Sequence, residues 1–108
     1  MVTVHRRQDA VFRAIADPTR REILRLLRGG RQTVGQLALN FPTSRPAISR
    51  HVRLLRSAGL IVTRETGATR LCELNAAPLC AVGDWLRDYD AFWRDSLRRL
   101  KRHVERRR

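Results

Sequence analysis

The chain has no long apolar run and is poor in cysteine. No stretch approaches the roughly 18 to 20 consecutive apolar residues that cross a bilayer, so we expect no transmembrane helix. A signal peptide has an apolar block after its charged start, and no such block follows the charges of residues 1–7. The two cysteines, Cys72 and Cys80, match neither a C-x-x-C motif nor a disulfide-rich scaffold. We therefore expect two reduced thiols in a cytoplasmic protein.

The sequence also lacks the motifs of common enzymes. It contains no Gly-rich phosphate loop, no Ser/His/Asp arrangement and no H-E-x-x-H motif. Asp84, Asp88 and Asp95 fall on one outer face of a predicted helix, beside arginines and away from any predicted pocket. We expect no enzymatic activity and no cofactor.

Acidic residues are scarce in the middle of the chain, and the positive charge is almost entirely arginine. The 108 residues carry 23 Lys plus Arg against 10 Asp plus Glu, a net charge of +13, and Lys101 is the only lysine. Residues 20–71 hold eleven arginines but only Glu22 and Glu65 as acids. With 43% hydrophobic residues the chain can form one folded domain. The charge predicts a polyanionic partner that binds the middle of that domain.

Helix signals dominate the first half. A helix is expected from about residue 8 to residue 16. It should end there because Asp17 precedes a proline, and residues before proline avoid the α region. Asp17 should then cap a second helix that ends at residues 29–30, both glycine. A short third helix is expected over residues 33–39 with Thr33 as its cap.

The fourth predicted helix begins after Ser44 and ends near residues 58–59. Its apolar residues recur at three- and four-residue steps and form one face: Ile48, Val52 and Leu55. The opposite face carries Pro46, Ser49, Arg50 and Arg53. An apolar face opposite hydroxyl and guanidinium groups is what a helix that reads a DNA groove requires, although it also fits an ordinary solvated basic face.

The second half opens with a different period. Residues 60–65 and 69–74 are rich in β-branched and alternating residues, and residues 66–68 contain a glycine, which predicts a two-stranded hairpin. Asn75 is expected to cap a long helix from about Pro78 to the C-terminus. Its near-heptad apolar stripe needs a partner: Leu79, Val82, Leu86, Tyr89, Trp93, Leu97, Leu100 and Val104.

The predicted elements have the order of a winged helix-turn-helix fold: short helices, a turn, a basic helix and then a hairpin. We therefore predict a mainly α fold with a β-hairpin wing. The roughly 12 Å wide major groove admits an α-helix, and a hairpin can reach the adjoining groove or phosphates.

Three segments resemble the ArsR family of bacterial winged-helix repressors: residues 12–27, 43–60 and 85–100. Within them, Pro-Ala-Ile-Ser-Arg-His at residues 46–51 is fairly specific for the family. The resemblance implies a homodimeric repressor that binds a palindromic operator in its own promoter region. It also implies dimerisation through the first and last helices, for which the candidate residues are Val11, Phe12, Ile15, Leu79, Val82, Leu86, Tyr89, Trp93, Leu97 and Leu100.

The same resemblance supplies candidate DNA-binding residues. On the recognition helix they are Ser44, Arg45, Ser49, Arg50 and Arg53, and on the wing Arg64, Thr66, Thr69 and Arg70. His51 is included as a residue near the DNA backbone. It projects beside the apolar face, however, so a packed or capping role is an equal alternative.

Two other functions stay open. Family metal sites use cysteines in the third helix or an acid-x-His pair in the last, and neither set is present here, so we expect no metal. A metal site assembled by dimerisation, or a redox switch through Cys72 and Cys80, would instead give a responsive derepressor. A module that binds protein or RNA is the alternative from another class.

The sequence thus predicts one DNA-binding domain, with residues 8–74 as helix-turn-helix core and wing and residues 75–108 as a dimerisation helix. We expect double-stranded DNA and a second copy of the chain as partners, no membrane, and association with the nucleoid.

Overall fold

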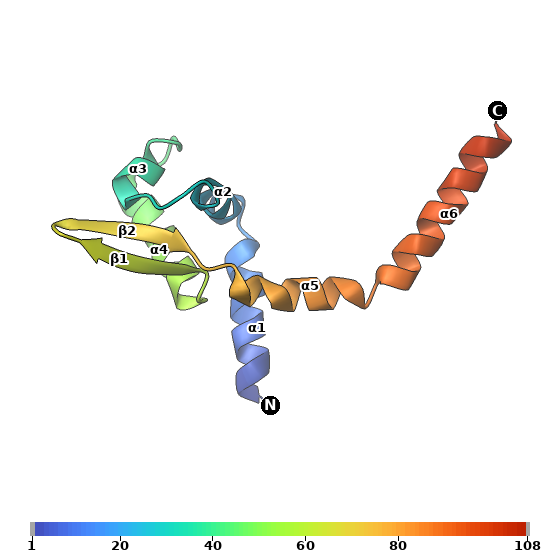
Figure 1. Cartoon of the computed structure of the whole chain (residues 1–108), viewed down its shortest axis with the longest axis horizontal. Helices are drawn as coiled ribbons and strands as arrows, with labels where there is room; N and C mark the ends of the chain where they lie inside the picture. The colour runs from blue at the N-terminus through green and yellow to red at the C-terminus, as the bar shows by residue number, and fades with distance from the viewer. Residues whose placement is uncertain (1, 108) are drawn as a thin grey trace.

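The structure, a computed structural model, describes residues 2–107, with side chains from residue 6 onward. The elements follow in the order α1 (Val2–Ile15), α2 (Pro18–Leu27), α3 (Val34–Ala38), α4 (Arg45–Ser57), β1 (Ile61–Thr66), β2 (Thr69–Leu74), the 3-10 turn η1 (Ala77–Leu79), α5 (Cys80–Arg87) and α6 (Asp90–Arg106). The predicted mainly α fold with a hairpin is confirmed (Figure 1). None of the described helices is long and apolar enough to span a bilayer.

One apolar core joins helices α1 to α4 to the base of the hairpin. Its buried side chains are Val11, Ala14, Ile23, Leu24, Leu27, Leu37, Ile48, Val52, Leu55, Leu60, Ile61 and Cys72. They include the predicted apolar face of α4. This core fixes α4 against α2 and α3, so its opposite face remains available to solvent.

The predicted caps set where three helices begin. The Asp17 carboxylate accepts from the backbone N–H of Arg20 at 3.0 Å, and Pro18 occupies the first position of α2. Thr33 and Gln36 bond reciprocally at the start of α3. Ser44 Oγ accepts from the Ala47 N–H at the start of α4. Because these signals are local, the sequence placed all three starts correctly.

The hairpin has the predicted strands and a tight turn. Pairing runs from Ile61 opposite Leu74 to Thr66 opposite Thr69, which leaves Gly67 and Ala68 as the connection. Gly67 has φ +63°, a left-handed conformation that glycine adopts without strain.

The first helix is longer than predicted, because it begins at Val2 rather than near residue 8. The prediction that Asn75 caps the C-terminal helix was wrong. Its side-chain amide donates to the Gly59 carbonyl at 2.8 Å, and its backbone N–H donates to the Leu60 carbonyl at 2.9 Å. Asn75 therefore ties the end of β2 to the segment that follows α4.

The single long C-terminal helix was also a wrong prediction, because the chain breaks between α5 and α6. The N–H groups of Asp88 and Tyr89 bond three residues back, to Trp85 and Leu86, which tightens the last turn of α5. Tyr89 then lies outside the helical region with φ −105° and ψ 3°. The apolar stripe continues across the break, so periodicity alone could not reveal it.

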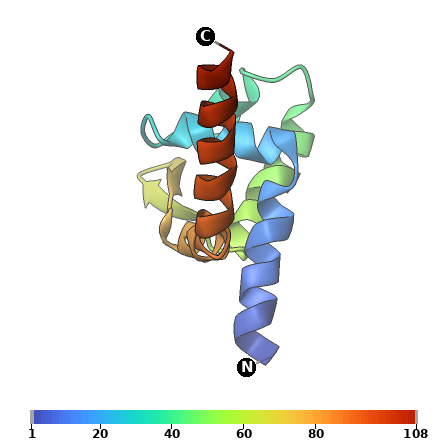
Figure 2. The same cartoon turned by 90° about the vertical axis from the view of Figure 1, so that its right-hand side faces the viewer.

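The two C-terminal helices are placed differently. Helix α5 packs on α1, where the rings of Phe12 and Trp85 meet edge to face at 5.7 Å. Helix α6 projects away from the winged body, and Figures 1 and 2 place its C-terminal end opposite the N-terminal end of α1. The Cα radius of gyration is 18.5 Å, whereas a compact domain of this length would have about 13 Å.

Candidate nucleic-acid interface

Helix α4 presents two chemically opposite faces. Ile48 and Leu55 are completely buried and Val52 nearly so, while Arg45, Pro46, Arg50 and Arg53 are exposed. The preceding helix α3 packs against α4 and completes a helix-turn-helix unit. An exposed, arginine-bearing helix held from behind has the geometry of an element that enters the major groove.

The arginines of α4 have no acidic partner within residues 6–107. By contrast, Arg25, Arg87 and Arg99 elsewhere are paired with Glu22, Asp84 and Asp95. Helix α4 itself contains no acid: its cations are Arg45, Arg50, Arg53 and Arg56, whereas Lys101 lies on α6. These guanidinium groups are therefore available for phosphate or base contacts.

Two candidate residues at the start of α4 are held by neighbouring groups. Ser44 Oγ already accepts the Ala47 N–H as the helix cap. The Arg45 guanidinium rests over α3, since a Cβ built on Gly35 would lie 3.4 Å from its Cζ. Ser49 is half-buried, whereas Arg50 and Arg53 are exposed candidates for base contacts.

The two wing arginines are not free. The Arg64 guanidinium donates to the Glu73 carboxylate. That hydrogen bond is the main cause that lowers the pKa of Glu73; burial opposes it, and the charge of Arg31 adds to the lowering. Arg70 donates to Glu65 at 3.2 Å. Thr66 and Thr69 are exposed beside the turn. The hairpin thus presents hydroxyl groups at its tip and internally paired charges along its strands.

His51 lies against α2. It is half-buried, and its Nδ1 lies 3.3 Å from Nη1 of Arg20 on α2. Nearby, burial would raise the pKa of Asp17, but the hydrogen bond from the Arg20 backbone N–H and the charge of Arg20 lower it overall. Sequence reasoning missed Arg20, because its only local signal was its spacing of three from Asp17.

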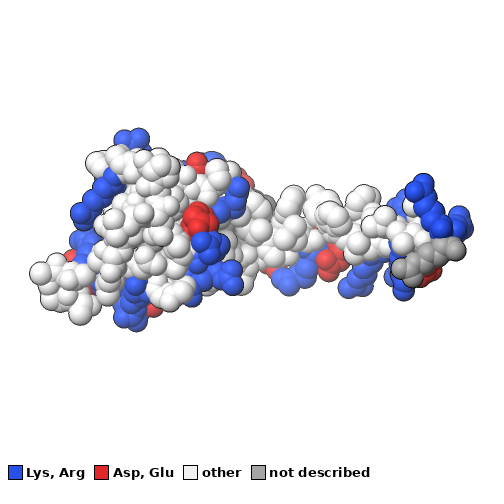
Figure 3. All heavy atoms as spheres, turned by 90° about the horizontal axis from the view of Figure 1, so that it is seen from above, with Lys and Arg blue, Asp and Glu red and all other residues white. Residues whose placement is uncertain are grey.

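Basic side chains are spread over the winged body and gather again at the far end of α6, with few acids between them (Figure 3). This distribution matches the sequence, in which residues 20–71 and 101–108 carry most of the excess charge.

An apolar surface follows α5 and α6. Exposed fractions lie between 44% for Tyr89 and 63% for Phe92. Of the residues predicted for a dimer interface, Leu86, Tyr89, Trp93, Leu97 and Leu100 are exposed and Phe12, Ile15, Leu79 and Val82 are half-buried. Val11 is different: it is 4% exposed and lies inside the core of its own chain.

The two cysteines occupy unlike environments and are not bonded to each other. Cys72 is buried, and burial raises the pKa of its thiol although Arg56 and Arg70 oppose the shift. Cys80 is exposed at the start of α5. Within the described part of the chain, no three His, Cys, Asp or Glu residues are grouped as metal ligands.

The fold and this helix together define a winged helix-turn-helix module. The model of the bacterial regulatory protein arsR family matches residues 17–63. The chain is 38% identical over 96 residues to the HTH-type transcriptional regulator Rv2034 of Mycobacterium tuberculosis, covering 89% of this chain and 87% of that protein. It is 40% identical over 79 residues to the transcriptional repressor SdpR of Bacillus subtilis, covering 73% and 88%.

Solved structures agree. An ArsR family transcriptional regulator, RHA00566, superposes with a TM-score of 0.73 at 35% identity, covering 82% of this chain and 92% of that one. The homodimeric winged helix-turn-helix domain Mb0332 of Mycobacterium bovis shares the fold, with a TM-score of 0.67 at 24% identity and coverage of 82% and 84%. The chain belongs to the ArsR family and is a DNA-binding transcriptional regulator, not an enzyme.

Proposed function

We propose that this protein represses transcription by occupying a palindromic operator as a homodimer, and that the operator lies upstream of its own gene. The observation that carries the proposal is the acid-free, arginine-bearing face of α4 opposite its buried apolar face. The name of the relative SdpR supports repression as the outcome of binding.

Helix α4 enters the major groove in this proposal. Arg50 and Arg53 read base edges, with Ser49 beside them, because a guanidinium group binds guanine bidentately. Ser44 and Arg45 approach the phosphates at the start of the helix. Thr66 and Thr69 contact the backbone from the hairpin tip, and Arg64 and Arg70 join them when DNA phosphate replaces their carboxylate partners.

A second copy covers the apolar surface of α5 and α6. Exposed Trp93, Leu97 and Leu100 extend along a helix that projects away from the rest of its own chain (Figure 1). The related fold Mb0332 is homodimeric, which supports this occupant. Two α4 helices related by a twofold axis would enter successive major grooves about 34–36 Å apart.

A binding titration at controlled salt concentration tests the proposal. The duplex is the DNA immediately upstream of the gene, and the control is a scrambled duplex of equal length. We expect a preference of about 10³-fold or more, with two subunits bound per site. Equal affinity for both duplexes would contradict a specific autorepressor, and tighter binding to RNA of equal length would favour the interaction module instead.

A further inference from the structure

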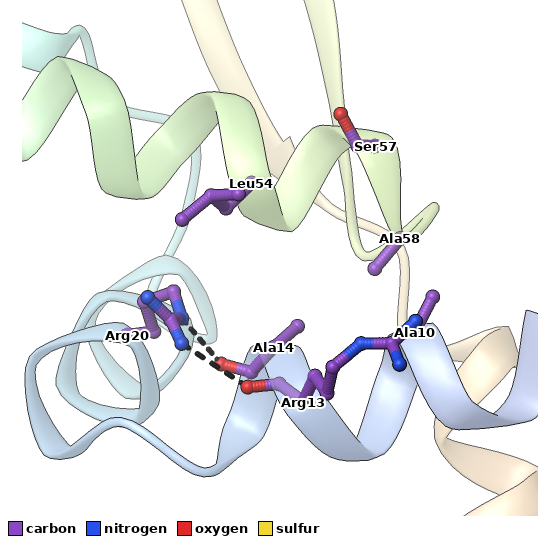
Figure 4. Close-up of a pocket in the computed structure, with 7 residues that line it drawn as sticks. All are labelled: Ala10, Arg13, Ala14, Arg20, Leu54, Ser57 and Ala58. Atoms are coloured by element: carbon purple, nitrogen blue, oxygen red, sulfur yellow. Dashed lines mark hydrogen bonds between the residues drawn. The ribbon is translucent and has the colours of Figure 1, made fainter.

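Arg20, in the first turn of α2, joins two other helices through one guanidinium group. Its Nε donates to the Ala14 carbonyl at 2.7 Å and its Nη2 to the Arg13 carbonyl at 3.1 Å, both in the last turn of α1 (Figure 4). Its Nη1 lies 3.3 Å from Nδ1 of His51 on α4. A guanidinium group can only donate, so His51 accepts this bond. The planar group thus holds α1 and α4 at a fixed relative position.

The neighbouring Arg21 shares only the first of these roles. The last carbonyls of a helix have no partner within the helix, and arginine side chains can supply one. Arg21 Nη1 donates to the Ile15 carbonyl at 2.9 Å and to the Ala16 carbonyl at 3.1 Å. Both arginines therefore cap the end of α1, but only Arg20 is also hydrogen-bonded to α4 within the described structure.

Val11 and Ala14 of α1 share the buried core with α4, but beside them the contact between the two helices is open. A groove of about 310 Å³ separates part of the two helices, and Figure 4 shows the small side chains of Ala10, Ala14 and Ala58 along it, with Leu54 on the α4 side. Small residues that leave a groove do not lock a helix against rotation. The core residues hold the buried face of α4. On the side of α4 that faces α1, the Arg20–His51 hydrogen bond adds a polar contact.

We propose that Arg20 is a positioning residue for DNA recognition. Through His51 it sets the orientation of α4 relative to α1, which carries Phe12 and Ile15 of the proposed dimer interface. This inference rests on the proposed function. The spacing and angle of the two recognition helices in a dimer depend on how each α4 is held against its own α1.

Arg20→Gln, with Arg21→Gln as the matched control, tests this role. Each variant removes one charge from the same helix turn, but only Arg20→Gln breaks the link to α4. We expect Arg20→Gln to reduce the preference for operator over scrambled duplex by about tenfold or more with an unchanged salt dependence, and Arg21→Gln to retain that preference. His51→Leu should resemble Arg20→Gln, and His51→Asn, which keeps an acceptor, should recover part of the preference.

Three results would overturn the proposal. Equal loss on both duplexes with a shallower salt slope would make Arg20 a phosphate contact. Equal effects of the two arginine variants would reduce it to a cap of α1. The third result comes from a measurement without DNA. Amide hydrogen exchange in α4 should be faster in Arg20→Gln than in Arg21→Gln, and identical exchange rates in the two variants would contradict the link. Failure of the wild-type protein to prefer its operator would instead count against the proposed function alone.

Discussion

The carboxylate of Glu73 on β2 holds the guanidinium of Arg64 on β1, a residue that sequence analysis assigned to DNA. The same carboxylate lies 3.6 Å from the guanidinium of Arg31, in the connection between α2 and α3. One acid therefore pairs with guanidinium groups from two separate segments of the chain.

Replacing Glu73 with glutamine should strengthen DNA binding. The change frees Arg64 and removes a negative charge, so we expect higher affinity for scrambled duplex and a salt slope steeper by up to about one. Glu22→Gln makes the same charge change by breaking the pair with Arg25 on α2, and serves as control. Fluorescence anisotropy at several salt concentrations measures both. If the two variants gain equally, the effect is net charge and the release of Arg64 contributes nothing.

Arg50→Ala should relax sequence discrimination. Arg50 is exposed and unpaired within the described residues, and loss of a bidentate base contact costs about 1–3 kcal/mol of discrimination. Competition between operator and scrambled duplex measures this loss. Arg25→Ala, on the exposed side of α2, should keep the discrimination. Unchanged discrimination in Arg50→Ala would mean that another face of α4 reads the bases.

Trp93→Asp should separate the proposed dimer. The side chain is 56% exposed on the apolar face of α6 in the single chain. In the proposed dimer this face is covered, and an unpaired carboxylate buried there would destabilise the association. Sedimentation equilibrium measures the association, and circular dichroism checks the fold. Ala91→Asp places the same charge on the other side of α6, so this variant should remain associated. A dimeric Trp93→Asp protein of native fold would contradict the interface.

Asp17→Ala should destabilise the fold by about 1 kcal/mol at pH 7, because α2 loses its N-cap. The pKa of Asp17 is lowered in the folded state, so its charge stabilises the fold above its ordinary pKa of about 3.9, and this contribution is lost as the pH falls through the lowered value. The difference from wild type in urea unfolding should therefore shrink in acid. Asp9→Ala, at an exposed position of α1, should show no such cap loss. A difference that grows in acid would refute the role of the carboxylate charge.

The two thiols should react at different rates. Cys80 is exposed, whereas Cys72 is buried with a raised pKa, so iodoacetamide should modify Cys80 first at neutral pH. Mass spectrometry over time measures each site, and labelling in urea should modify both. Rapid modification of Cys72 in the folded protein would revive the redox-responsive alternative.

The part of the fold that the sequence predicted is the part specified by local signals. Asp17, Thr33 and Ser44 act within three residues of their own positions, and Gly67 needs only its own backbone conformation. The buried face of α4 followed directly from the spacing of its apolar residues.

What the sequence did not predict depends on contacts between distant residues. Arg20 and His51 lie 31 residues apart, and Asn75 reaches Gly59 across the hairpin. The pairing of Arg64 with Glu73 depends on the register of the two strands. The alternation of residues predicted the strands but not which side chains would lie beside each other. The break at Tyr89 lies inside an apolar stripe that fits one continuous helix equally well.

The restriction of the single lysine to α6 has a chemical consequence for the DNA-binding face. The arginine side chains of α4 end in guanidinium groups, and the helix carries no primary amine. Lysine acetylation and amine-directed labels therefore find no side chain on α4. Such reagents can modify Lys101 while leaving the side chains of α4 unchanged.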